Sequence, residues 1–375
     1  DIAHRGAVAG NGAAGRDRSR RTAGAGSNRR GRRRRCGGED PPPSSPDGGG
    51  QSAPVARARS RPGGVRCDHR VWGNGRRATA DAVGGTESPS AVSTVKTTDG
   101  FTLHVQTWGE SNKTPIIMVH GYPDSHTVWD TIAQDLAHDY YVITYDVRGA
   151  GKSDTPKAIR AYRLEQLAQD LAAVAKQTIG ERAFHLVGHD WGSIQSWESV
   201  TTPRLQGQIL SFTTLSGPSL DHAAIWLRDR AKDNKRTFFG QLAKSWYIAF
   251  FHLPWAAPLV WQLLWGKYWH KAVEVLEQTK DLPQNPSQTA DGKRGVNLYR
   301  ANFIDRLWHP QQRFAHCPVQ AIVLERDAFV GKALMDDLAR WVPDLTMHRL
   351  NAGHWGILSR PQEVASLIRQ FVQAQ

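Results

Sequence analysis

The segment Gly188-His189-Asp190-Trp191-Gly192 constrains the fold of this chain more than any other feature. An apolar run at residues 183–187 precedes it, and a helical stretch follows it. This order predicts a strand, a sharp turn flanked by glycines and a helix, with the Asp190 carboxylate presented at the turn. A carboxylate there can displace a leaving group at saturated carbon, and the resulting ester can be hydrolysed at its own carbonyl.

Strand-like and helix-like segments alternate from Val95 onward, a pattern typical of a mostly parallel sheet covered by helices. The strand candidates are short apolar runs at residues 101–108, 115–120, 141–146, 183–188, 208–215, 319–324 and 346–350. Leu164, Leu167, Leu171 and Val174 recur at helical spacing and are followed by Gly180, which is suited to ending a helix. The pattern therefore predicts an α/β fold.

The alternation breaks between about Leu220 and Phe314, a stretch of helical character that holds 7 of the 14 tryptophans. Strand–helix alternation resumes at Pro318, which favours an insertion over an independent helical domain. We predict a sheet-bearing core from residues 94–218 and 314–375, with a helical lid at 219–313. Residues 245–265 have about the length of a bilayer span, but they include two prolines and a histidine, and we interpret them as lid helices.

Residues 1–93 differ in composition from the rest of the chain. They hold 18 arginines, no lysine and 8 acidic residues, whereas the remaining 282 residues hold 30 basic and 27 acidic residues. With one Ile, one Trp and no Leu, Phe, Met or Tyr, this leader is expected to be disordered. A basic arm for nucleic acid is one interpretation. Translation of GC-rich DNA upstream of the true start explains the composition better, so we expect no nucleic-acid partner.

Chemically useful residues follow several of the expected strands. His120-Gly121-Tyr122-Pro123 follows the run at 115–120, Asp327 follows 319–324, and His354 follows 346–350. Open α/β sheets place their sites at the carboxyl ends of their strands. We therefore expect these side chains to meet Asp190 at one edge of the sheet.

These motifs and their order resemble the α/β-hydrolase superfamily, and within it the epoxide hydrolases. The likeness covers residues 94–375 and includes Ser245-Trp246-Tyr247 and Asn297-Leu298-Tyr299-Arg300 in the lid. The run is also similar to the hydrolase part of actinobacterial proteins that fuse such a domain to a short-chain dehydrogenase. The resemblance implies a mostly parallel eight-stranded sheet flanked by helices, with an inserted helical lid.

The resemblance also implies roles for individual residues. Asp190 would attack an epoxide carbon, while Tyr247 and Tyr299 protonate the departing oxygen. His354, oriented by Asp327, would then activate water. It must be neutral to do so, which an ordinary histidine pKa of about 6.5 allows at or above neutral pH. The backbone N–H groups of Tyr122 and Trp191 match the oxyanion hole, and we expect Trp191, Trp246, Phe250 and Tyr122 to contact substrate.

Several alternatives stay open at the level of sequence. Glu325 competes with Asp327, and Tyr268 with the two lid tyrosines. A haloalkane dehalogenase would use the same Asp/His/Asp set, but Tyr122 stands where such enzymes commonly carry an Asn for the halide. A non-catalytic, lipid-binding homologue is the third interpretation, although it has no need of a complete catalytic set. We interpret Asp124 as a helix-capping or loop residue.

The aromatic lid predicts an apolar or lipid-like epoxide as substrate, with water as the second reactant. The same surface could instead make a homodimer or a peripheral membrane contact. No metal or organic cofactor is implied. Three cysteines, two of them in the leader, form no disulfide framework, and we expect a cytoplasmic protein.

Overall fold

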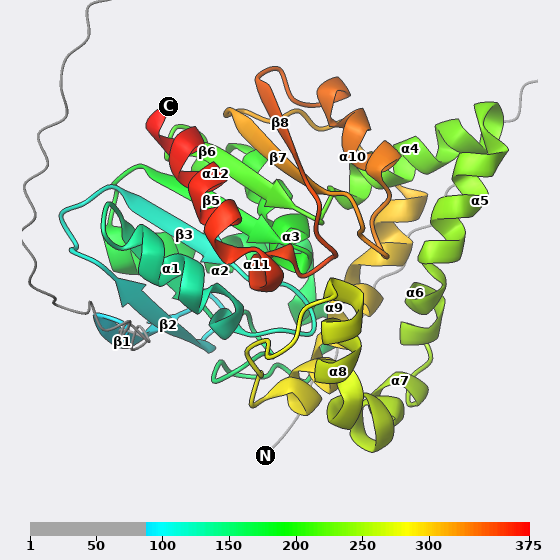
Figure 1. Cartoon of the computed structure of the whole chain (residues 1–375), viewed down its shortest axis with the longest axis horizontal. Coiled ribbons are helices and arrows are strands. Elements are labelled where there is room, and N and C mark those ends of the chain that lie inside the picture. The colour runs from blue at the N-terminus through cyan, green and yellow to red at the C-terminus, as the bar shows by residue number, and fades with distance from the viewer. Residues whose placement is uncertain (1–87) are drawn as a thin grey trace, which may run out of the picture. The chain divides into compact units, whose positions relative to one another are not determined.

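The fold is built around an eight-stranded sheet, seen in a computed structural model that describes residues 88–375 (Figure 1). The strand order is β1-β2-β4-β3-β5-β6-β7-β8, with β1 and β2 antiparallel to their neighbours and all other pairs parallel. The strands are β1 (Ala91–Lys96), β2 (Thr102–Trp108), β3 (Pro115–Val119), β4 (Tyr141–Tyr145), β5 (Phe184–His189), β6 (Ile209–Leu215), β7 (Val319–Leu324) and β8 (Leu345–Leu350). The predicted α/β-hydrolase architecture, an eight-stranded and mostly parallel sheet flanked by helices, is confirmed.

Strand β1 had no counterpart among the predicted strands. Five of its six side chains are exposed and only Val95 is buried, so it lacks the apolar alternation by which strands are recognised. Because β1 begins at Ala91, the core starts before residue 94, and the predicted leader boundary at 93 is wrong by these few residues. The rest of the leader prediction concerns residues that lie outside the described part of the chain.

Helices cover both faces of the sheet. One face carries α1 (Asp130–Leu136) and α12 (Pro361–Gln373), and the other carries α2 (Leu164–Ile179) and α3 (Trp191–Val200), as Figure 1 shows. Helix α2 ends as its leucine spacing predicts, since Gly180 follows it with a φ of 67°. The central strands β3, β5 and β7 are buried at every position, as expected for strands covered on both sides.

All residues between β6 and β7 that form regular structure are helical, where the lid was predicted. The elements are α4 (Leu220–Asp233), α5 (Lys235–Lys244), α6 (Trp246–Phe251), α7 (Ala256–Val260), the π-helical turn η4 (Trp261–Trp265), α8 (Gly266–Glu277) and α9 (Gln288–Trp308). The span-length stretch at 245–265 is divided between three of these short elements. None of the helices among the described residues combines the length and the hydropathy needed to cross a bilayer.

Ion pairs, of which those to Glu198 and Asp221 are buried, attach the lid to the core. The guanidinium of Arg306, near the end of α9, contacts the carboxylates of Glu165, Glu198 and Asp221 at 2.6, 3.0 and 2.8 Å. Glu198 belongs to α3 and Asp221 to α4, so this one side chain joins the base of the lid to the helix that follows Asp190. The lid base is therefore fixed close to the reactive turn.

Candidate active site

The turn between β5 and α3 holds Asp190 in an unusual backbone conformation, with φ 51° and ψ −123°. A non-glycine residue in this region stores about 1–3 kcal/mol of strain. The flanking glycines make the turn possible: a Cβ at Gly188 would lie 2.6 Å from the Cα of Ser193, and one at Gly192 would collide with the carbonyl of Val119. The strain and the close approach present the Asp190 side chain at the strand end.

The two carboxylate oxygens of Asp190 have different surroundings. Oδ1 accepts a hydrogen bond of 2.7 Å from the backbone N–H of Tyr122, which follows β3. Oδ2 lies 3.5 Å from Nε2 of His354. The N–H of Trp191 is the other expected donor. Trp191 opens α3 directly after the turn, but the structure records no bond from its N–H to Asp190 within the described residues. The carboxylate is thus held by one oxygen, leaving the other facing the histidine and the cavity.

The predicted acid and base meet as expected. His354 follows β8, and its Nδ1 lies 3.0 Å from Oδ2 of Asp327, which follows β7. The second oxygen of Asp327 accepts bonds from the backbone N–H groups of Phe329 and Val330, at 2.7 and 2.9 Å. Burial raises the pKa of Asp327, but His354 and these N–H donors outweigh it, so the net pKa is lowered. The competing Glu325 is turned away and lies 4.0 Å from Lys332.

The expected ordinary pKa of His354 is wrong for the resting site. Burial lowers the pKa of this imidazole, but Asp327 and Asp190, on either side of the ring, raise it to about 10. The charged form is therefore the stable one at neutral pH while both carboxylates are ionised. The neighbouring His189 behaves oppositely: burial lowers its pKa to about 4, and its Nε2 lies 2.8 Å from the carbonyl of His354.

Both predicted lid tyrosines lie in the cavity beside Asp190. Tyr247 from α6 and Tyr299 from α9 line the same cavity as Asp190 and His354, with their ring centroids 6.0 Å apart. Burial raises the pKa of each phenol above its ordinary value of 10, so both are protonated donors at neutral pH. The competitor Tyr268 is 46% exposed and does not line the cavity.

The cavity has a volume of about 190 Å³. Tyr122 and Trp246 line it, as predicted, but Phe250 and Trp191 do not. Phe251 takes the place of Phe250 because it lies one helical turn after Tyr247 and so shares its face of α6. The Phe250 ring packs on Trp265 instead, at a centroid distance of 5.5 Å. Trp191 lies behind Tyr299, with ring centroids 4.9 Å apart.

Other apolar residues line the cavity that were not predicted from the sequence: Pro123, Trp265, Trp269, Leu276, Phe329 and Trp355. Two signals were available. Trp261, Trp265 and Trp269 recur every four residues, which is the spacing of one helical face. Phe329 comes two residues after Asp327, and Trp355 directly follows His354.

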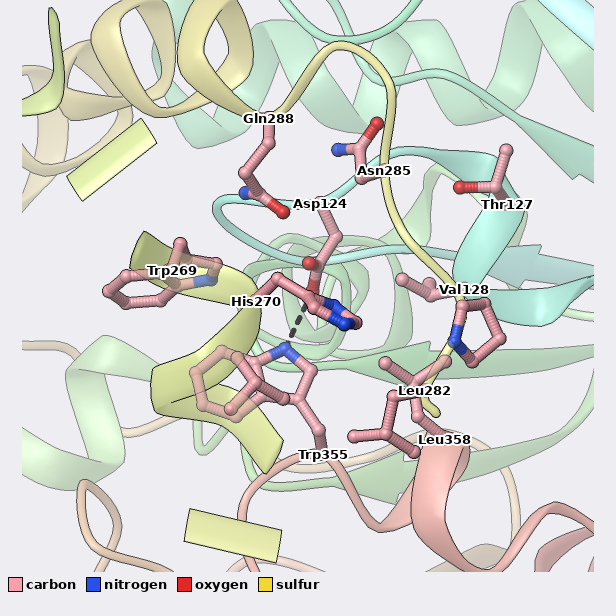
Figure 2. Close-up of a pocket in the computed structure, with 12 residues that line it drawn as sticks. Asp124, Thr127, Val128, Trp269, His270, Leu282, Asn285, Gln288, Trp355 and Leu358 are labelled. Atoms are coloured by element: carbon pink, nitrogen blue, oxygen red, sulfur yellow. Dashed lines mark hydrogen bonds between the residues drawn. The ribbon is translucent and has the colours of Figure 1, made fainter. Parts of the chain in front are cut away.

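A small second cavity of about 30 Å³ adjoins the first (Figure 2). The rings of Trp269 and Trp355 line both cavities. Figure 2 shows Asp124 reaching the indole of Trp355, whose Nε1 donates a bond of 3.0 Å to Oδ2. Asp124 is 4% exposed, and burial raises its pKa to about 7. Of its two interpretations, helix cap or loop residue, the structure supports the second: Asp124 lies in the loop after β3, Ser125 takes the cap position, and the Asp124 carboxylate holds the tryptophan that follows His354.

Among residues 88–375, one trio of potential metal ligands lies close together. These are His104, His126 and Asp146, whose ligand atoms are within 4.8 Å of one another. Asp146 already accepts bonds from the backbone N–H of His126 and Lys152, at 2.9 and 2.8 Å. The trio lies outside the catalytic cavity and ties the loop after β3 to the end of β4.

Known proteins are similar to this chain in sequence and in fold. "Probable oxidoreductase EphD" of Mycobacterium tuberculosis is 32% identical over 292 residues, covering 74% of this chain and 48% of that protein, so the chain spans about half of its length. Epoxide hydrolase 3 of Xenopus tropicalis is 25% identical over 289 residues, covering 73% of this chain and 75% of that protein. The solved structure of an epoxide hydrolase from Bacillus megaterium has a TM-score of 0.63 at 20% identity, covering 75% of this chain and 100% of that one.

A family comparison extends over most of the described part of the chain. The match to the α/β hydrolase fold runs through residues 114–361 and so includes the reactive turn, the lid, Asp327 and His354. This chain belongs to the α/β-hydrolase fold family.

Proposed function

We propose that this chain is an epoxide hydrolase that converts an apolar epoxide and water to a vicinal diol. The observation that carries the proposal is the cavity that Asp190 shares with two protonated tyrosines, the half-buried Tyr247 and the buried Tyr299. Relatives named epoxide hydrolases support it. An epoxide oxygen leaves as an alkoxide, which is a poor leaving group unless it is protonated. The two phenols can donate that proton.

In the first step, Oδ2 of Asp190 attacks a ring carbon, the carbon–oxygen bond of the epoxide breaks, and Tyr247 or Tyr299 gives its proton to the oxygen. Oδ1 becomes the carbonyl oxygen of the ester, still bound to the N–H of Tyr122. The attacking oxygen is already the one that faces the cavity. No rearrangement of the carboxylate is needed.

The same step prepares the base. Esterification removes the negative charge of Asp190, which is one of the two carboxylates that raise the pKa of His354. The pKa of the imidazole then falls, its proton restores the tyrosine that lost one, and the neutral ring accepts a proton from a water molecule. That water attacks the ester carbonyl, and the oxyanion that forms on Oδ1 is bound by the N–H of Tyr122 and of Trp191. The oxyanion re-forms the carbonyl, the bond between the Asp190 carboxyl carbon and the former Oδ2 breaks, and the imidazolium protonates that oxygen as the diol leaves. Asp190 keeps the oxygen of water, and its remaining proton returns to His354, which restores the resting charges.

Tyr122, the residue after Gly121, favours epoxide hydrolysis over haloalkane dehalogenation. The Tyr122 hydroxyl donates to the carbonyl of Gly292 and accepts a bond of 2.6 Å from Nε1 of Trp261. It is therefore engaged with the lid instead of directed at Asp190 as a halide ligand would be.

A single turnover with excess enzyme in heavy-oxygen water tests the proposed chemistry. We expect the label in the Asp190 carboxylate and none in the first diol, because the oxygen inserted into that diol comes from the protein. Label found directly in the first diol would show that water opens the ring. A parallel panel of haloalkanes, with halide release as the readout, separates the dehalogenase alternative.

A further inference from the structure

The outer part of the lid combines cationic and apolar side chains without any acid. Residues 234–273 hold five lysines and arginines and no Asp or Glu. Lys235, Arg236, Lys267 and Lys271 are exposed. The 282 residues that follow the leader carry 30 basic and 27 acidic residues in total, so this lack of acids is a local property.

The same stretch exposes large apolar side chains. Trp255 is 74% exposed and Leu263 is 69% exposed. The other members of this set are Phe239, Leu242, Trp246, Leu253, Leu259, Leu264 and Tyr268. They come from α5 to α8, and helices α5, α6 and α7 follow one another along the side of the lid away from the sheet (Figure 1). We call this set, together with the four cations above, the lid surface.

We propose that the lid surface docks on an anionic phospholipid bilayer. Tryptophan with lysine and arginine is the composition of protein segments that lie in the headgroup region, where indoles insert and cations meet phosphate.

A second copy of this chain is a poorer occupant of the lid surface. A twofold contact places the same patch against itself, so the lysines and arginines of the two copies would face one another. No carboxylate in residues 234–273 is available to neutralise them. An anionic lipid surface supplies the missing negative charge as well as an apolar layer.

The cavity that holds Asp190 borders the lid surface, because Trp246 belongs to both. Trp246 and Leu276 line the cavity and are also 63% and 38% exposed. An apolar substrate dissolved in the bilayer could therefore enter at the docked face without crossing water. This second part of the inference rests on the proposed function, whereas the docking does not.

Vesicle co-sedimentation of the full chain tests the docking. We compare vesicles of phosphatidylcholine with vesicles containing phosphatidylglycerol, and measure wild type, Trp255→Ser/Leu263→Ser and Lys267→Glu/Lys271→Glu. Each lid pair should weaken binding to the anionic vesicles by roughly tenfold or more. One pair removes two inserted apolar side chains, and the other reverses two charges that attract anionic headgroups. Neither Trp255 nor Leu263 lines the catalytic cavity.

Matched controls lie on the core: Ile159→Ser/Leu210→Ser removes exposed apolar side chains, and Lys157→Glu/Arg160→Glu makes the same charge change. These should bind within about twofold of wild type, because they are away from the patch. Equal binding by all variants would place the interaction elsewhere, including the arginine-rich leader, and would overturn the proposal. So would a dimer in equilibrium sedimentation that the lid pairs dissociate while vesicle binding stays unchanged.

Turnover separates the docking from the chemistry. The lid pairs should lower kcat/KM for a long-chain epoxide embedded in anionic vesicles and leave turnover of a water-soluble epoxide unchanged, which also shows that they fold. Equal loss on both substrates would contradict delivery from the bilayer. Vesicle binding without turnover of any epoxide would instead refute the proposed function and leave the docking intact.

Discussion

At the scale of single residues, chemically similar groups in the site have different surroundings and therefore different properties. The two oxygens of Asp190 differ because one is bound by the N–H of Tyr122 and the other faces His354. Two histidines in contact differ as well: carboxylates raise the pKa of His354, while burial lowers that of His189. These differences assign one role to each atom in the proposed reaction.

The lid tyrosines give the first prediction at this scale. Replacing Tyr247 and Tyr299 together by phenylalanine should slow formation of the ester by about 100-fold or more, the usual contribution of a positioned acid. Stopped-flow tryptophan fluorescence during a single turnover measures that step. Tyr268→Phe is the matched control and should leave it unchanged, since this phenol is on the surface. An unaltered rate in the double variant would remove the phenols from the mechanism.

The raised pKa of His354 gives the second prediction at the residue scale, which concerns how stability depends on pH. The folded protein holds a proton on this ring up to a pKa of about 10, whereas the unfolded chain releases it near 6.5. The stabilisation is therefore complete below about pH 6.5 and is lost as pH rises toward 10. Urea unfolding of wild type and His354→Gln between pH 6 and 10 measures it. The free energies of the two proteins should converge as pH rises, and a constant difference would contradict the stated pKa.

At the scale of elements, the sequence predicted those strands and helices whose apolar pattern shows which side is buried. It did not predict which face of each short lid helix is turned inward. Buried strands were recognisable from their apolar runs, and α2 from its leucine spacing and Gly180. The lid helices are short, so their sequence does not show which face is turned inward, and Phe250 was chosen where Phe251 lines the cavity. The contact of Asp124 with Trp355 could not be predicted, because the two residues are 231 positions apart in sequence.

The attachment of the lid gives a prediction at this scale. Arg306→Gln removes one of the two guanidiniums that pair with the buried carboxylates of Glu198 and Asp221. Because Arg313 still contacts both carboxylates, the free energy of unfolding should fall by about 3 kcal/mol, the lower end for a broken buried pair. The control Arg340→Gln breaks an exposed pair with Asp229, 2.8 Å long, and should cost about 1 kcal/mol or less. Equal losses in urea unfolding would show that Arg306 is not a structural anchor.

At the scale of the molecule, the sheet collects groups that are far apart in the chain. Strands β3, β5, β7 and β8 end at one edge, and the loops after them carry Tyr122, Asp190, Asp327 and His354. This convergence could be predicted because the order of motifs along the sequence resembles that of a known family. The shape of the cavity could not, since it depends on lid side chains whose contacts are set only in the folded protein.

The central claim is a covalent bond between Asp190 and a saturated carbon of the substrate. We would mix His354→Gln with an epoxide, quench in acid and analyse the peptide containing Asp190 by mass spectrometry. The account predicts added mass equal to one whole epoxide on Asp190, accumulating because water is no longer activated, and none in Asp190→Asn/His354→Gln. Diol formation by the wild type with no adduct on this peptide in His354→Gln, for any epoxide that the wild type consumes, would contradict it.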